Sequence, residues 1–149
     1  MSQQSTVSPL NALRHHAVTG PSANILQEFY EYFGFTQLII EESPDPEYIQ
    51  ALTGGAWSAA RILKLKNSVG DVLEIIEPSI LAGELTSGGA GNWSHLAFTV
   101  LSCDEAVSDV LGMGGHLVGG PVTNPEAPFR VAYVRDPALN LIELVEAMP

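Results

Sequence analysis

Hydrophobic and polar positions along the first half of the chain predict one helix and four strands. The apolar face of the helix, expected over residues 22–33, would be formed by Ile25, Leu26, Phe29 and Phe33. Short segments in which apolar residues alternate with polar ones or run together are typical of strands, and they fall near residues 13–20, 35–42, 58–66 and 71–77. The segment 44–56, which contains two prolines and two glycines, is expected to be a loop.

The second half predicts the same order of elements. A helix is expected near residues 103–112, because Ser102 and Glu105 have the spacing of a capping box. Strands are expected near residues 94–101, 115–119, 129–135 and 140–146. Residues 67–70 and 136–140 would form the hairpin turn before the last strand of each half.

The two halves are also similar in sequence. Residues 15–22 (HHAVTGPS) align without gaps on residues 95–102 (HLAFTVLS), and residues 67–77 align on residues 136–146. The chain is therefore expected to be one domain built from a repeated unit. A disordered or extended tail over residues 1–12 would precede the domain over 13–149, which consists of module one (about 13–78), a glycine- and serine-rich linker (79–93) and module two (about 94–149).

Composition excludes several classes of protein. The 149 residues are 46% hydrophobic, which is enough for a core, and no apolar run approaches the roughly 20 residues of a membrane span. Six basic residues against 17 acidic ones give a net charge of −11, which disfavours nucleic acid and anionic membranes as partners. The single cysteine, Cys103, excludes an internal disulfide, and the polar N-terminus lacks the pattern of a signal peptide, so a cytoplasmic location is expected.

Four residues at equivalent positions of the repeat form the candidate site: His15, Glu74, His95 and Glu143. On a strand, each glutamate would lie between two apolar neighbours on its own face, where a carboxylate is unfavourable unless its charge is compensated. Two carboxylates facing two imidazoles are a suitable set for one divalent metal ion, namely nickel, zinc, cobalt, iron or manganese. Such a set would leave two positions of an octahedral sphere for substrate oxygens or water.

Taken singly, each of these residues would be interpreted as structural or solvated, and it is their coincidence in both halves that favours a metal site. The second glutamate of each last strand, Glu77 and Glu146, would point to the opposite face and is expected to be solvated. His16 and His116 are expected to be structural or at the surface, and Cys103 to be inert.

Several segments, taken in order, resemble the vicinal oxygen chelate superfamily, which includes glyoxalase I, bleomycin-resistance proteins and extradiol dioxygenases. The most specific segment is VAYVRDP (131–137) followed by NLIEL (140–144), and weaker matches fall at 15–35, 70–74 and 95–100. The resemblance implies an α+β fold of two tandem βαβββ modules, whose curved mixed sheets surround a metal cavity. In the glyoxalase I pattern of the family, the metal ligands fall on the same four residues.

The resemblance also implies a function, a metal-dependent lyase or isomerase of the glyoxalase I type. Glu74 or Glu143 would be the catalytic base that takes a proton next to a metal-bound carbonyl or hydroxyl group of a small-molecule substrate. Alternatives are an epimerase acting on an acyl thioester, a non-haem iron dioxygenase, and a non-catalytic, resistance-type protein that binds a small molecule. Thr19 and Pro78 stand where short bacterial glyoxalase I sequences have an arginine and an asparagine, which argues against glutathione. A homodimer is implied, with each metal site built within one chain or across two.

Overall fold

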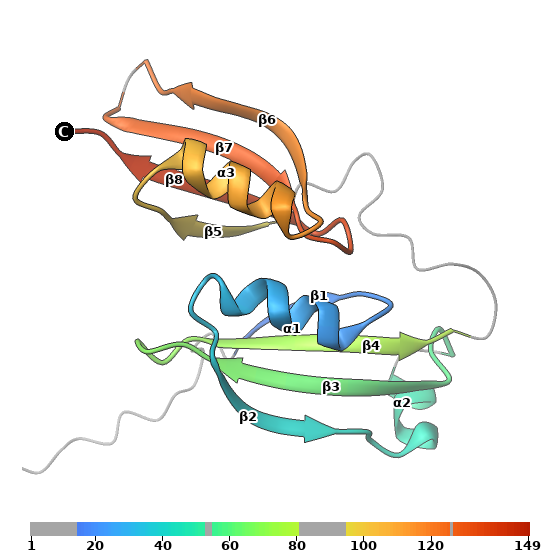
Figure 1. Cartoon of the computed structure of the whole chain (residues 1–149). Coiled ribbons are helices and arrows are strands. Elements are labelled where there is room, and N and C mark those ends of the chain that lie inside the picture. The colour runs from blue at the N-terminus through green and yellow to red at the C-terminus, as the bar shows by residue number, and fades with distance from the viewer. Residues whose placement is uncertain (1–14, 53–54, 81–94, 126) are drawn as a thin grey trace, which may run out of the picture.

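The computed structural model describes residues 15–52, 55–80, 95–125 and 127–149. In chain order the elements are β1 (His16–Thr19), α1 (Ala23–Glu31), β2 (Gln37–Glu42), α2 (Pro46–Leu52), β3 (Ala59–Lys66), β4 (Val72–Ser79), β5 (Leu96–Thr99), α3 (Cys103–Gly112), β6 (His116–Thr123), β7 (Phe129–Arg135) and β8 (Leu141–Ala147). Each half thus follows the order βαβββ, with α2 added in the first half (Figure 1). The expected α+β fold of two tandem modules is confirmed, whereas the tail 1–12 and most of the linker lie outside the described residues.

The strands of each module form one mixed four-stranded sheet. The order is β1-β4-β3-β2 in module one and β5-β8-β7-β6 in module two. The first strand of each module runs parallel to the last, and the other neighbours are antiparallel. The register is also repeated, because Ala17 pairs with Glu74 in one module and Ala97 pairs with Glu143 in the other.

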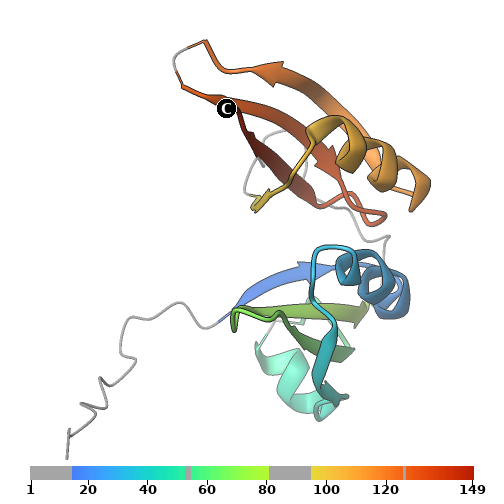
Figure 2. The ribbon, with the colours of Figure 1, turned by 60° about the vertical axis from the view of Figure 1, so that its left-hand side comes forward.

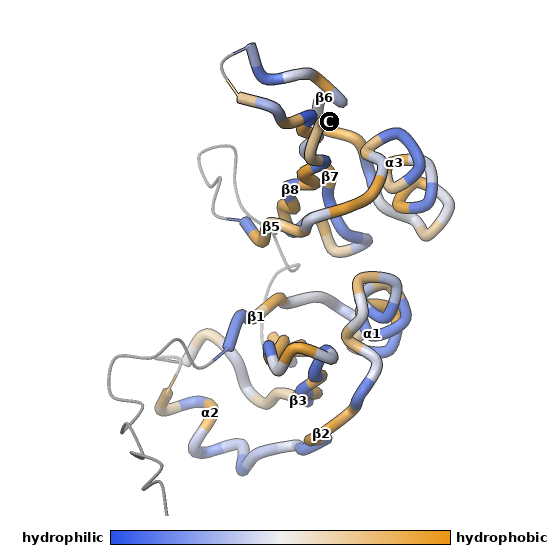
Figure 3. The backbone as a smooth tube through the Cα atoms, turned by 90° about the vertical axis from the view of Figure 1, so that its left-hand side faces the viewer, coloured by the Kyte–Doolittle hydropathy of each residue, from blue (hydrophilic) through white to orange (hydrophobic). Residues whose placement is uncertain are grey.

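One face of each sheet is covered by the module's long helix, α1 or α3 (Figure 2). On β3, for example, Leu63 and Leu65 are fully buried on the helix side, whereas Ile62 and Lys64 at the alternate positions are only partly buried. Figure 3 shows both hydrophobic and hydrophilic residues along the strands of the two sheets. We call the face that bears Lys64 and Glu74 in module one, and Tyr133 and Glu143 in module two, the open face of each sheet.

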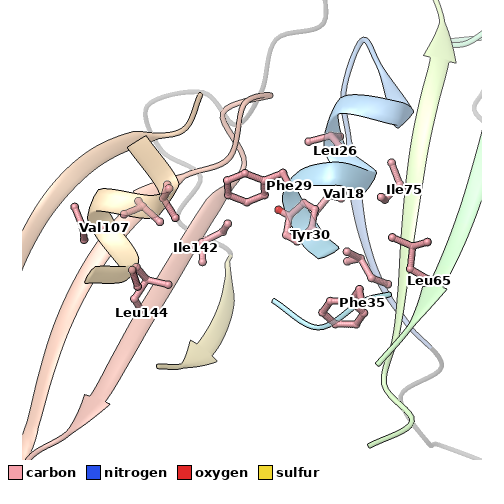
Figure 4. Packing of buried hydrophobic residues seen from close by; sticks show 14 of the residues in the cluster. Val18, Leu26, Phe29, Tyr30, Phe35, Leu65, Ile75, Val107, Ile142 and Leu144 are labelled. Atoms are coloured by element: carbon pink, nitrogen blue, oxygen red, sulfur yellow. The ribbon is translucent and has the colours of Figure 1, made fainter. Parts of the chain in front are cut away.

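Helix α1 also packs against module two, so that the buried residues of both modules form one hydrophobic cluster (Figure 4). Phe33 stacks on Phe98 of β5, with ring centroids 4.4 Å apart. The hydroxyl of Tyr30 donates to the buried carboxylate of Asp136 at 2.7 Å, and this hydrogen bond joins the two modules through the core. The side chain of Asn140 adds a second link by donating to the carbonyl oxygen of Thr19 at 3.0 Å.

Three expectations about the elements were wrong in detail. Ile25 is 54% exposed, because the buried face of α1 is formed by Ala23, Leu26, Phe29 and Tyr30. The segment expected as a loop contains α2, whose start has a proline at the first helical position and Asp45, which accepts from the backbone N–H of Tyr48. Strand β6 continues past residue 119 to Thr123, since an edge strand tolerates a proline and the bulges on either side of Gly119.

None of the helices in the described ranges is long and apolar enough to cross a lipid bilayer.

Candidate metal centre

The structure brings His15 and Glu74 together on the open face of module one. His15 immediately precedes β1, and Glu74 is in the adjacent parallel strand β4. Their Nε2 and Oε2 atoms are 3.6 Å apart, and their side chains are 27% and 12% exposed. The carboxylate is therefore largely withdrawn from water and lies beside a nitrogen donor.

Module two repeats this arrangement with His95, which precedes β5, and Glu143 of β8. Here the Nε2 and Oε2 atoms are 2.9 Å apart, and the side chains are 29% and 24% exposed. The pairs recur because both modules use the same parallel register. In each module an alanine of the first strand lies directly beside the glutamate, and the histidine lies two residues before that alanine, on the same face of the sheet.

The spacing within each pair fits two ligands of one metal ion. Imidazole nitrogens and carboxylate oxygens bind such ions at about 2.0–2.2 Å, so two of them at right angles are separated by about 3 Å. The separations of 2.9 Å and 3.6 Å need only small side-chain rotations to reach this geometry. The nitrogen and oxygen donors present in each pair are also those that divalent transition metals accept.

The two pairs do not meet within one chain. Among the described residues, which include all four candidates, no three His, Cys, Asp or Glu side chains gather into a group that could hold a metal ion. One chain therefore presents two separate candidate half-sites, each with one imidazole and one carboxylate.

Each half-site has a third side chain that the sequence analysis did not identify. Lys64 of β3 is the cross-strand neighbour of Glu74, and its Nζ lies 3.4 Å from the same Oε2 atom that His15 approaches. Tyr133 of β7 is the equivalent neighbour of Glu143, and its ring meets that of His95 edge to face, with centroids 5.3 Å apart. In module two the signal was available, because counting outward from the predicted turn over residues 136–140 pairs Tyr133 with Glu143. In module one the predicted turn over residues 67–70 would pair Lys64 with Leu73, because the observed turn is one residue longer.

The second glutamate of each last strand has a structural role instead of being solvated. Glu77 accepts a hydrogen bond from the backbone N–H of Ala23, and Glu146 accepts one from that of Cys103, both at 2.7 Å. Ala23 and Cys103 are the first residues of α1 and α3, so both carboxylates compensate the unpaired donors and the positive end of a helix. The expectation was wrong because it considered the strand alone, without the helix that covers it.

The remaining candidate residues do not join the two half-sites. His16 and His116 are exposed at strand ends, in accordance with a structural or surface role. Cys103 is fully buried, its thiol donates to the carbonyl oxygen of Arg130, and burial raises its pKa, so the inert role expected for it fits this environment. A separate open hollow of about 460 Å³ lies between the end of α1 and the start of α3, and its lining includes Phe33 and Leu101 but none of the four candidates.

Comparison with known proteins identifies the fold. No protein-family model and no curated protein sequence matches the chain. Among solved structures, a glyoxalase-family protein from Bacillus cereus matches with a TM-score of 0.72 at 23% identity, covering 92% of this chain and 94% of that one. The genomically encoded fosfomycin resistance protein FosX from Listeria monocytogenes matches with a TM-score of 0.63 at 18% identity, covering 93% and 94%. A glyoxalase-family protein from Enterococcus faecalis matches with a TM-score of 0.62 at 21% identity, covering 92% and 99%.

These neighbours are members of the vicinal oxygen chelate superfamily, so the chain has the fold of the superfamily that its sequence resembles.

Proposed function

We propose that the protein is a metal-dependent enzyme that takes a proton from a small-molecule substrate, as a lyase or isomerase of the glyoxalase I type. The observation that carries this proposal is the presence of two equivalent histidine–glutamate pairs, each with the spacing of two ligands on one ion. A chance pair of this kind could arise once, but the same pair at the same register of both modules indicates a shared task. FosX, whose fold the chain shares, has been crystallised with Mn(II), which supports a divalent metal.

The complete site is proposed to form between two copies of the chain. In a two-fold symmetric dimer, His15 and Glu74 of one copy would meet His95 and Glu143 of the other, and the second site would form in the same way. The open faces have the apolar surface that such a contact would cover, since Ile40 of β2 is 38% exposed and Val122 of β6 is 62% exposed.

The bound metal would supply a Lewis acid that stabilises negative charge developing on a substrate oxygen. Both histidines, as neutral imidazoles, would hold the ion through the nitrogens that face the glutamates. One glutamate, Glu74 or Glu143, would act as general base toward a substrate C–H and return the proton to the product, while the other stays in place. Burial of these carboxylates beside apolar strand neighbours reduces competition from water for the proton.

Metal analysis of purified variants tests the site. We expect stoichiometric divalent metal in the wild type and loss of most of it in His15→Ala and in Glu143→Ala. His116→Ala, which changes a histidine outside both pairs, should keep the wild-type metal content. Unchanged metal content in both site variants would refute the assignment, and a wild type without metal whose ligand binding survives EDTA would favour the non-catalytic binding protein.

A complementation experiment tests the assembly. One variant carries His15→Ala with Glu74→Ala, the other carries His95→Ala with Glu143→Ala, and neither alone should bind metal. Because a mixed dimer would retain one intact cross-chain site, co-refolding equal amounts should restore about a quarter of the wild-type metal per chain. Sites built within one chain would restore none.

A further inference from the structure

The open face of module one carries a lysine that the metal site itself does not need. Lys64 reaches Glu74 from β3, with Nζ 3.4 Å from the carboxylate oxygen, and its side chain is only 24% exposed. The equivalent position of module two is Tyr133, although the register, the histidine and the glutamate are all repeated. Lys64 therefore breaks the symmetry of the two half-sites by one positive charge.

The other cationic side chains with anionic partners in the described part of the chain are engaged away from the candidate ligands. Arg61 pairs with Glu41, and Arg130 pairs with Asp104. Lys66 lies two residues beyond Lys64 on the same strand, next to the hairpin turn at Gly70. Lys64 differs because its partner is a candidate metal ligand.

Charge balance indicates what Lys64 is for. In the proposed site a divalent ion neutralises the two glutamates, so the ammonium group of Lys64 would leave one uncompensated positive charge within a few ångströms of the ion. Such a charge repels the metal and is unfavourable in a partly buried position unless an anion accompanies it.

We propose that Lys64 binds an anionic group of the substrate, and that the substrate is a small molecule with one carboxylate, phosphate or phosphonate group near its reacting carbon. This inference rests on the proposed metal site and adds the substrate class. A single lysine suits one compact anionic group, which agrees with the scarcity of basic residues in the chain as a whole.

Binding of simple anions to the metal-loaded protein tests the inference without any substrate. Mn(II) affinity is measured first for the wild type, Lys64→Met, Lys64→Arg and the matched control Lys66→Met. Acetate and methylphosphonate are then titrated by calorimetry at saturating Mn(II). We expect Lys64→Met to bind Mn(II) at least as tightly as the wild type but to bind the preferred anion about tenfold more weakly. Lys64→Arg should restore most of the anion affinity, and Lys66→Met should change it by no more than about twofold.

The outcomes separate the two proposals. If Lys64→Met binds Mn(II) and both anions as the wild type does, the inference about Lys64 is overturned while the metal site stands. If Lys64→Met loses Mn(II) affinity but, once saturated, keeps its anion affinity, Lys64 only holds Glu74 in position and the inference is again overturned. If the wild type binds no Mn(II), the proposed function fails and the inference fails with it. A preference for acetate or methylphosphonate identifies which anionic group the site accepts.

Discussion

Replacing Tyr30 with phenylalanine removes one hydroxyl group from the core and tests the link between the modules. That hydroxyl donates to Oδ2 of Asp136 at 2.7 Å, and neither side chain has measurable exposure. Burial and the neighbouring Asp136 raise the pKa of Tyr30 well above its usual value, so the hydroxyl stays protonated and remains a donor. The substitution keeps the ring and its packing, and therefore isolates the hydrogen bond.

The expected loss follows from the charge of the acceptor. A hydrogen bond to an ionised group contributes about 1.5–3 kcal/mol, and Asp136 keeps its other donors, the N–H groups of Ala138 and Asn140 and the side chain of Asn140. We therefore expect Tyr30→Phe to lower the free energy of unfolding by about 2 kcal/mol at neutral pH.

The loss should depend on pH. Burial raises the pKa of Asp136 above its ordinary value, against the opposing effect of its hydrogen bonds. A raised pKa in the folded state favours folding at low pH and loses that contribution as the pH rises through the folded-state value. Because the variant lacks one bond to the ionised form, the pKa of Asp136 rises further in it. The loss in free energy of unfolding caused by Tyr30→Phe should thus shrink to about 1 kcal/mol when Asp136 is protonated, because the hydrogen bond that is lost is then one between neutral groups.

Urea unfolding followed by circular dichroism at pH 7 and at a lower pH at which the protein still folds measures both quantities. Tyr32→Phe is the matched control, because its hydroxyl also reaches module two, donating to Asp109 at 2.9 Å, but at the exposed surface. It should cost no more than about 0.5 kcal/mol at either pH. Equal losses for the two variants, or a larger loss for Tyr30→Phe at the lower pH, would refute the reasoning.

Two further predictions concern local structure, and both are measured by the same unfolding assay. Glu146→Ala removes the acceptor for the N–H of Cys103 at the start of α3 and should cost about 1 kcal/mol, with a negligible effect ruling out the capping role. Leu139 has a φ of 69°, and its counterpart in the repeat is Gly70 with a φ of 96°. Leu139→Gly should therefore stabilise the protein by about 1 kcal/mol and Gly70→Ala should destabilise it by a similar amount, so that changes of the same sign would contradict the argument.

Local patterns in the sequence were sufficient for most of the elements and for the two pairs. A period of two residues in strands, together with an ungapped repeat, places His15 with Glu74 and His95 with Glu143 on one face of each sheet. The same reasoning failed for the buried face of α1. Ile25 and Leu26 are both apolar, but adjacent residues on a helix point about 100° apart, and only the contact with module two decides that Tyr30 is buried instead of Ile25.

The roles of Glu77 and Lys64 depend on contacts that lie between elements. Glu77 compensates the start of α1 because the helix passes over the end of β4, and a strand pattern contains no information about that crossing. Lys64 meets Glu74 through the antiparallel register of β3 and β4, whereas the turn predicted over residues 67–70 would have paired Lys64 with Leu73. The equivalent neighbour of Glu143 is an aromatic residue, Tyr133. Only the paired strands show that the glutamate of one module has a charged neighbour and that of the other an aromatic one.

The sequence by itself determined that the protein consists of two related modules and that each has a histidine beside a glutamate, because these features arise from periodicity and from neighbouring strands. Only the tertiary structure decided that the two pairs stay apart within one chain. The distance between them depends on how α1 packs on module two, through Phe33 on Phe98 and Tyr30 on Asp136. Those contacts join residues 65 to 106 positions apart, and no periodic pattern along the chain encodes them.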